Sequence, residues 1–267
     1  MFGAKNSAIR LGFLAGLSML AACADEGAQS SAPAQASATS STSAATAAAP
    51  AATEGRINMS QCNPPAEGRV AFKVGEAVLR VPGAAIENAV PTGLQGQVKT
   101  EAVLQEVQAR VSQGEGCPNR PLDSQLLVVQ SGLTHQHLGP GLGFRRADDR
   151  FTQQYAQLIN QLRDNPTGRC QEAQGGLLAC RGTETNSGRE TDVLYFISTD
   201  KAVRMNSGSP LFARCLISAE GISGCAMFDR LAAGSIYETR LNPGKYTSES
   251  LKAAQQLIVA RISQWRS

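Results

Sequence analysis

The first 22 residues decide in which compartment this chain folds, and therefore whether its cysteines can form disulfides. Residues 1–10 carry two basic side chains, Lys5 and Arg10, and no acidic one. Residues 11–20 are uncharged and mostly apolar. As a helix they would span about 15 Å, roughly half of a bilayer core. This pattern is typical of a secretion signal and too short for a spanning helix. We expect residues 1–22 to be removed on export and the remainder to fold in an oxidising compartment.

The signal ends in Leu20-Ala21-Ala22-Cys23. This tetrapeptide matches the lipobox of bacterial lipoproteins, and the resemblance implies that the thiol of Cys23 receives a diacylglycerol before cleavage. Buried acyl chains contribute about 0.8 kcal/mol per CH₂, so two or three of them hold a protein stably on a membrane. Lipoproteins kept at the inner membrane often have Asp after the cysteine. Ala24 stands there instead, which favours an outer-membrane anchor with the domain facing the periplasm.

Residues 23–55 predict a tether that carries the lipidated cysteine at its start. Residues 24–55 are rich in Ala, Ser and Thr and contain no large apolar side chain. Such a segment cannot bury enough surface to offset the entropy of ordering, so we expect it to be disordered. As a flexible coil it would span roughly 30 Å, which is enough to lift a domain clear of the lipid headgroups.

Residues 56–133 predict a first α+β subdomain. The run RVAFKVGEAVLRVP at 69–82 alternates apolar and polar side chains around a Gly75-Glu76 turn, which places Phe72 opposite Leu79 on one face of a hairpin. A helix with an apolar face is expected from Thr100, and residues 125–130 predict a strand. The stretch 134–147 combines Gly and Pro with no periodicity, so it predicts a linker.

Residues 148–267 predict a second α+β subdomain. Asp148 and Asp149 begin the strongest amphipathic helix. Short strands separated by turn residues follow up to residue 241, with one of them at 202–205. A last helix begins near Ser248 and presents one apolar face, made of Leu251, Ala254, Ile258, Ile262 and Trp265. The expected fold is α+β, a mainly antiparallel sheet with flanking helices, braced by disulfides and arranged as two subdomains or one continuous fold.

The six cysteines other than Cys23 predict three disulfides, because an even number in an exported chain favours pairing. Cys170 and Cys180 flank one predicted hairpin turn, and Cys215 and Cys225 flank another, so each pair falls directly opposite across its hairpin. This pairing leaves Cys62 with Cys117. Bridges from one hairpin to the other are the alternative.

No catalytic, metal or cofactor site is predicted. His135 and His137 could share one side of a strand, but no third ligand lies near them, and a solvated or hydrogen-bonded pair is the favoured interpretation. The chain has no Gly-x-Ser-x-Gly elbow, no CxxC motif and no phosphate-binding loop. The formal net charge is only +3, so the composition does not favour a nucleic-acid partner.

The general plan favours a binding protein. A lipobox, a low-complexity spacer and a small disulfide-braced α+β domain are similar in layout to the immunity lipoproteins of contact-dependent secretion systems, and the AFKVGEAVLRVP segment resembles the first hairpin of some of them. The resemblance implies a membrane-anchored protein that binds and neutralises a secreted toxin. A structural or assembly lipoprotein of the envelope is the second hypothesis, and a hydrolase with an unrecognised site is the third.

Overall fold

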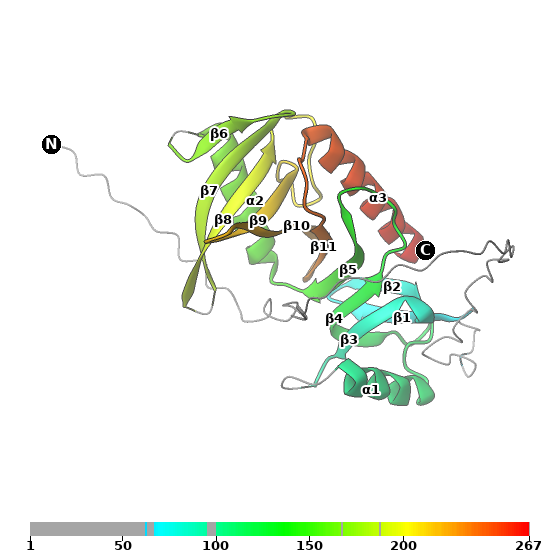
Figure 1. Ribbon diagram of the computed structural model, residues 1–267. Coiled ribbons are helices and arrows are strands. Elements are labelled where there is room, and N and C mark those ends of the chain that lie inside the picture. Colours follow the sequence, from blue (N-terminus) through cyan, green and yellow to red (C-terminus); the bar gives the residue numbers. More distant parts are fainter. Residues whose placement is uncertain (1–61, 63–66, 95–99, 167, 187, 267) are drawn as a thin grey trace, which may run out of the picture.

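A computed structural model describes residues 62, 67–94, 100–166, 168–186 and 188–266 (Figure 1). The expected signal (residues 1–22), Cys23 and the expected tether (residues 24–55) lie outside these residues. The described chain forms strands, α-helices and one 3₁₀ turn in the order β1 (Arg69–Val74), β2 (Ala77–Pro82), η1 (Gly83–Ala85), β3 (Ile86–Pro91), α1 (Thr100–Ser112), β4 (Leu122–Gln130), β5 (Leu138–Arg146), α2 (Asp149–Asp164), β6 (Cys170–Ala173), β7 (Leu177–Asn186), β8 (Arg189–Ser198), β9 (Phe212–Ser218), β10 (Gly221–Ala232), β11 (Ser235–Leu241) and α3 (Ser248–Arg266).

The strands form one 11-stranded sheet in the order β2-β1-β4-β5-β11-β10-β9-β8-β7-β6, with β3 also paired to β4. The short contact between β1 and β4 is parallel, and the other pairings are antiparallel. The predicted fold class is therefore confirmed. One hydrophobic cluster runs through both halves of the chain, so the fold is continuous.

The hairpin registers follow the alternation read from the sequence. Phe72 lies opposite Leu79 in the β1–β2 hairpin, and both side chains are fully buried. The Gly75 turn of this hairpin packs against the β10–β11 turn, where the backbone N–H of Glu76 donates to the carbonyl of Ala233 at 3.0 Å. The two halves of the chain therefore meet through their turns as well as through the sheet.

Helices α2 and α3 pack on opposite faces of the sheet. Tyr155 of α2 meets the ring of Tyr195 on β8 at a centroid distance of 6.1 Å. On the other face, Trp265 of α3 meets Phe144 on β5 at 6.1 Å. The predicted apolar face of α3 is buried, and Asp148 caps α2 by accepting from the backbone N–H of Arg150 at 2.9 Å. No described helix is both long and apolar enough to cross a membrane.

The prediction of a linker at 134–147 is wrong for most of that segment. Residues 138–146 form β5, which pairs with β4 on one side and with β11 on the other. Its alternate residues Gly139, Gly141 and Gly143 remove the apolar periodicity that marks a strand in a sequence. Hydrogen bonds from two neighbouring strands supply the order that the side chains do not.

Two further differences concern short segments. Residues 202–205, expected as a strand, contain only an isolated bridge between Arg204 and Pro210. The segment 86–91, which has no strong pattern of its own, forms β3 by pairing with β4. In both places the backbone partners available nearby decide the conformation, and local propensity does not.

Candidate functional site

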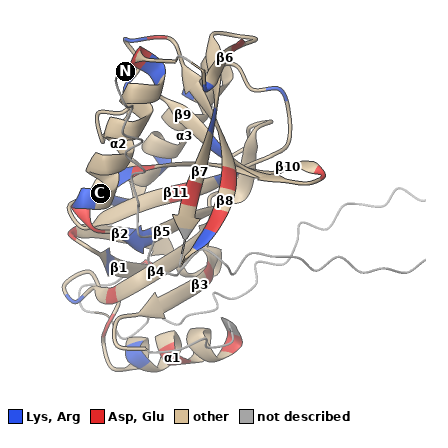
Figure 2. Ribbon diagram, turned by 90° about the vertical axis from the view of Figure 1, so that its left-hand side faces the viewer, with Lys and Arg blue, Asp and Glu red and all other residues tan. Residues whose placement is uncertain are grey.

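The β9–β10 hairpin extends beyond the sheet on both of its sides. Leu216 is the last residue of β9 that pairs with β8, and Cys225 is the first residue of β10 that pairs with β11. Residues 217–224, which we call the finger, therefore have no neighbouring strand among the described residues. Figure 2 shows this hairpin projecting from the body of the molecule, on the side of β7 and β8 away from α2.

The tip of the finger presents an apolar side chain to solvent. Ile222 is 53% exposed, more than Val78 or Leu257, the other exposed large apolar residues of the described chain. It lies directly opposite Ile217, so the two side chains share one face of the ribbon. Together the two isoleucines form a small apolar patch on one face of the finger.

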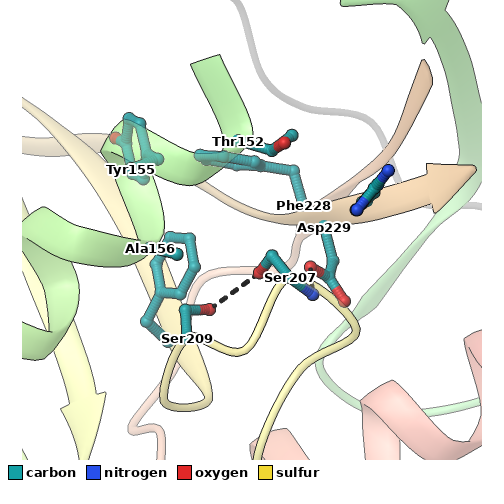
Figure 3. A pocket seen from close by; sticks show the side chains of 9 residues that line it. Thr152, Tyr155, Ala156, Ser207, Ser209, Phe228 and Asp229 are labelled. Carbon is teal, nitrogen blue, oxygen red and sulfur yellow. Dashed lines mark hydrogen bonds between the residues drawn. The ribbon is translucent and has the colours of Figure 1, made fainter. Parts of the chain in front are cut away.

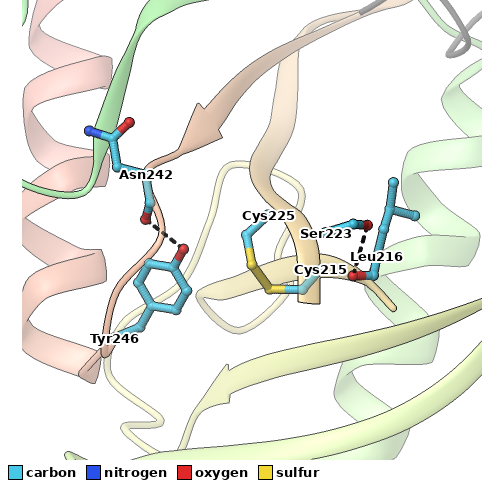
Figure 4. The surroundings of a disulfide bond; sticks show 6 residues. All are labelled: Cys215, Leu216, Ser223, Cys225, Asn242 and Tyr246. Carbon is cyan, nitrogen blue, oxygen red and sulfur yellow. Dashed lines mark hydrogen bonds between the residues drawn. A yellow bond between two sulfur atoms is a disulfide. The ribbon is translucent and has the colours of Figure 1, made fainter. Parts of the chain in front are cut away.

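Hydrogen bonds inside the finger fix its shape. The hydroxyl of Ser218 accepts from the backbone N–H of Glu220 at 3.3 Å and donates to the carbonyl of Gly221 at 3.2 Å. The hydroxyl of Ser223, at a bulge in β10, donates to the carbonyl of Leu216 at 3.4 Å (Figure 4). The finger therefore has a defined conformation before any partner arrives.

A disulfide closes the root of the finger. Cys215 and Cys225 lie directly opposite each other with a Cα separation of 4.0 Å (Figure 4). An isolated two-stranded ribbon is marginally stable in water. This crosslink closes a loop of about 11 residues and contributes nearly 3 kcal/mol in the chain-entropy model. The disulfide thus offsets the absence of neighbouring strands.

A buried charged cluster anchors β9 just before that disulfide. The Arg214 guanidinium donates to both carboxylate oxygens of Glu184 on β7, with Nε at 2.9 Å from each and Nη2 at 2.5 Å from Oε2. The hydroxyl of Tyr195 donates to the same carboxylate at 2.6 Å, and the hydroxyl of Tyr155 on α2 also donates to it. Three strands and one helix are joined at this point.

The electrostatics of the cluster keep its ion pair charged. Burial alone would raise the pKa of Glu184, but the hydrogen bonds and the charge of Arg214 outweigh it and hold that pKa below its usual value. Burial raises the pKa of both tyrosines, Tyr155 and Tyr195, and the Glu184 charge raises it further. The carboxylate is therefore the shared acceptor of the cluster.

A small hollow lies between α2 and the loop that precedes β9 (Figure 3). Its volume of about 10 Å³ leaves room for about one water molecule, and it is lined by aromatic rings and by the hydroxyls of Ser207 and Ser209. Burial raises the pKa of Asp229 at its edge. Both oxygens of that carboxylate already accept backbone N–H groups, from Asn206 at 2.5 Å and from Ser207 at 3.0 Å. The Asp229 carboxylate therefore stabilises the loop that precedes β9.

The predicted disulfides are confirmed as Cys62–Cys117, Cys170–Cys180 and Cys215–Cys225. The two histidines form the expected hydrogen-bonded pair, in which the backbone N–H of His137 donates to Nδ1 of His135 at 3.2 Å. Burial, and then the charge of His135, lowers the pKa of His137. In the described part of the chain, no three His, Cys, Asp or Glu side chains gather in a way that could hold a metal ion.

The sequence reasoning found the hairpin at 215–225 and its disulfide, but it missed the projection of the finger and the Glu184–Arg214 cluster. The isoleucines flanking the hairpin turn were the available signal for an exposed apolar tip. Comparison with known protein families, with curated proteins and with solved structures found no match to this chain.

Proposed function

We propose that this protein is a lipid-anchored binding protein of the bacterial envelope that faces the periplasm. In this proposal it protects its own cell by binding and neutralising a secreted antibacterial toxin. Acylated Cys23 would hold it on the outer membrane, and residues 24–55 would let the domain reach its partner. The lipobox and spacer support the location, and the resemblance in layout to immunity lipoproteins supports the role.

The braced finger is the observation that carries the proposal. An exposed Ile222 on a ribbon that is closed by Cys215–Cys225 costs little entropy to order when a partner binds, because most of that order exists beforehand. Burying the exposed half of the Ile222 side chain would contribute about 0.8–1.6 kcal/mol, which corresponds to roughly 4–15-fold in affinity. A finger of this kind suits insertion into the cleft of a toxin, where a few anchors supply most of the binding energy.

Competition between sister cells tests the proposal. A strain that lacks the gene is grown in contact with its parent, and its survival is compared with that of strains carrying the gene, the Ile222→Asp variant or the Ile222→Val variant. We expect deletion to reduce survival only in contact with the parent. The wild-type gene and Ile222→Val should restore survival, while Ile222→Asp should fail although the protein accumulates normally.

A growth or envelope defect of the deletion strain in pure culture, with no added effect of parent cells, would contradict the immunity proposal. That outcome would instead favour the second candidate, a structural or assembly lipoprotein of the envelope. The Ile222→Val variant is the matched control, because it keeps an apolar β-branched side chain at the tip.

A further inference from the structure

The face of β8 that carries Leu194 is only partly covered beside the finger. Tyr195 points to the α2 face, so Leu194 and Phe196 belong to the opposite one. There, Tyr246 packs on Phe196 at a centroid distance of 5.7 Å, just before α3 begins. Leu194 is only half-buried, and the two residues that precede it on the same face of β8, Asp192 and Glu190, are exposed. Figure 2 shows α2 on one side of β7 and β8 and the finger projecting on the other.

A row of apolar side chains, which we call the strip, runs along this face to the tip of the finger. Leu194 lies directly opposite Cys215, and Cys215 lies opposite Cys225, so all three share one face. Ile217 follows two residues after Cys215 and is therefore on that face too, with Ile222 opposite it. Cys215 and Cys225 are buried, so the accessible part of this row consists of the half-buried Leu194 and Ile217 and the exposed Ile222.

Acidic side chains flank this strip. Asp192 and Glu190 alternate with Leu194 along the same face of β8, and both are exposed. Glu220 is exposed at the finger tip. Among the residues that the structure describes, none of these three carboxylates has a basic group within 4.0 Å. Arg181 lies opposite Leu194 on β7, and Arg169 lies opposite Arg181 just before β6, so the basic residues of this face lie on the β6–β7 side and the acids lie on β8.

We infer that this surface, made of the finger and the exposed face of β8, binds a protein that presents an apolar socket beside a cationic patch. The inference rests on the proposed function and specifies the chemistry of the partner at the same site. Ile222 would enter the socket, and Glu190 and Asp192 would face the cationic groups. Complementary charge of this kind accelerates association and excludes wrong partners. An anionic membrane surface is disfavoured, because the same carboxylates would be repelled by its headgroups.

Charge reversal in the full, lipidated chain tests the inference. The Glu190→Lys/Asp192→Lys double variant is compared with Glu76→Lys/Glu101→Lys, which reverses two exposed glutamates on the N-terminal half of the chain. Each is expressed in the deletion strain, and survival beside the parent is measured. We expect about tenfold less protection from the β8 reversal and unchanged protection from the control reversal. Equal thermal melting of the two variants would show that folding is unaffected.

A second readout does not depend on toxin immunity. A photoreactive benzoyl-phenylalanine at position 223, on the finger, should form a covalent adduct with a protein in living cells. We expect the β8 reversal to abolish that adduct and the control reversal to leave it unchanged. If the β8 reversal abolishes the adduct but the deletion strain survives normally beside its parent, the immunity proposal is refuted and the binding surface is supported.

Two outcomes would overturn the inference. In the first, the deletion strain is killed, but the β8 reversal protects it fully and keeps the adduct. The partner then does not contact Glu190 and Asp192, and the immunity proposal holds without the inferred surface. If the reversal increases protection or adduct formation, the occupant is anionic, either as a protein or as a lipid surface.

Discussion

Replacement of Glu184 by Gln should destabilise the protein strongly at neutral pH, although the two side chains have nearly the same shape. Glu184 is 7% exposed and is the acceptor for Arg214, whose side chain is 12% exposed. The variant leaves the Arg214 guanidinium without a counter-charge in a covered site that already holds a second arginine, Arg145. Breaking a buried ion pair from one side costs about 3–5 kcal/mol. The Glu184→Gln/Arg214→Met double variant should lose less, because neither charge remains.

The sign of the pH dependence follows from the lowered pKa of Glu184. A carboxyl with a depressed folded-state pKa stabilises the fold above its unfolded value of about 4.3, and this contribution is lost as the pH falls through the folded-state value. Urea unfolding followed by the fluorescence of Trp265, the only tryptophan, measures both variants at pH 7 and below pH 4. The reasoning would be refuted if the free energy of unfolding of Glu184→Gln differed from that of wild type by less than about 1 kcal/mol at pH 7. It would also be refuted if this difference were not smaller below pH 4 than at pH 7.

Three other changes have calculable outcomes. Gly75→Ala should lower the free energy of unfolding by about 1–3 kcal/mol, because the new Cβ would lie 2.6 Å from a carbonyl of the β10–β11 turn. Gly68→Ala, also at positive φ but with open space around it, should cost less in the same urea titration. Replacing Cys215 and Cys225 by Ser should remove nearly 3 kcal/mol and abolish hydrogen-exchange protection in residues 217–224, with the rest of the sheet still protected. Thr247→Ala removes the side-chain acceptor that caps α3 and should cost about 1 kcal/mol, seen as a lower Tm.

The parts of the fold that the sequence predicts are those in which the decisive contacts are local. Alternation around Gly75 is enough to set the β1–β2 register, because a shift by one residue would move every apolar side chain to the wrong face. The same reasoning pairs Cys170 with Cys180 and Cys215 with Cys225. These features depend on about ten consecutive residues and on the chemistry of one turn.

The parts that the sequence does not predict depend on distant neighbours. The glycine-rich strand β5 forms because β4 and β11 lie on either side of it. Glu184 and Arg214 are 30 residues apart and meet only after three strands have paired. The projection of the finger is likewise non-local, since it depends on where β8 and β11 stop pairing with their neighbours. No window of the sequence contains that information.

The Cys62–Cys117 bridge has a mechanical consequence under the proposed anchorage. A pull on the tether reaches Cys62 before it reaches β1, and the bridge transfers that load to Cys117, ahead of the central strand β4. Without the bridge, tension would act directly on the start of β1 and would break its few pairings with β4 one after another. If the chain is anchored as proposed, this bridge would let the domain bear tension between membrane and partner without unfolding from β1.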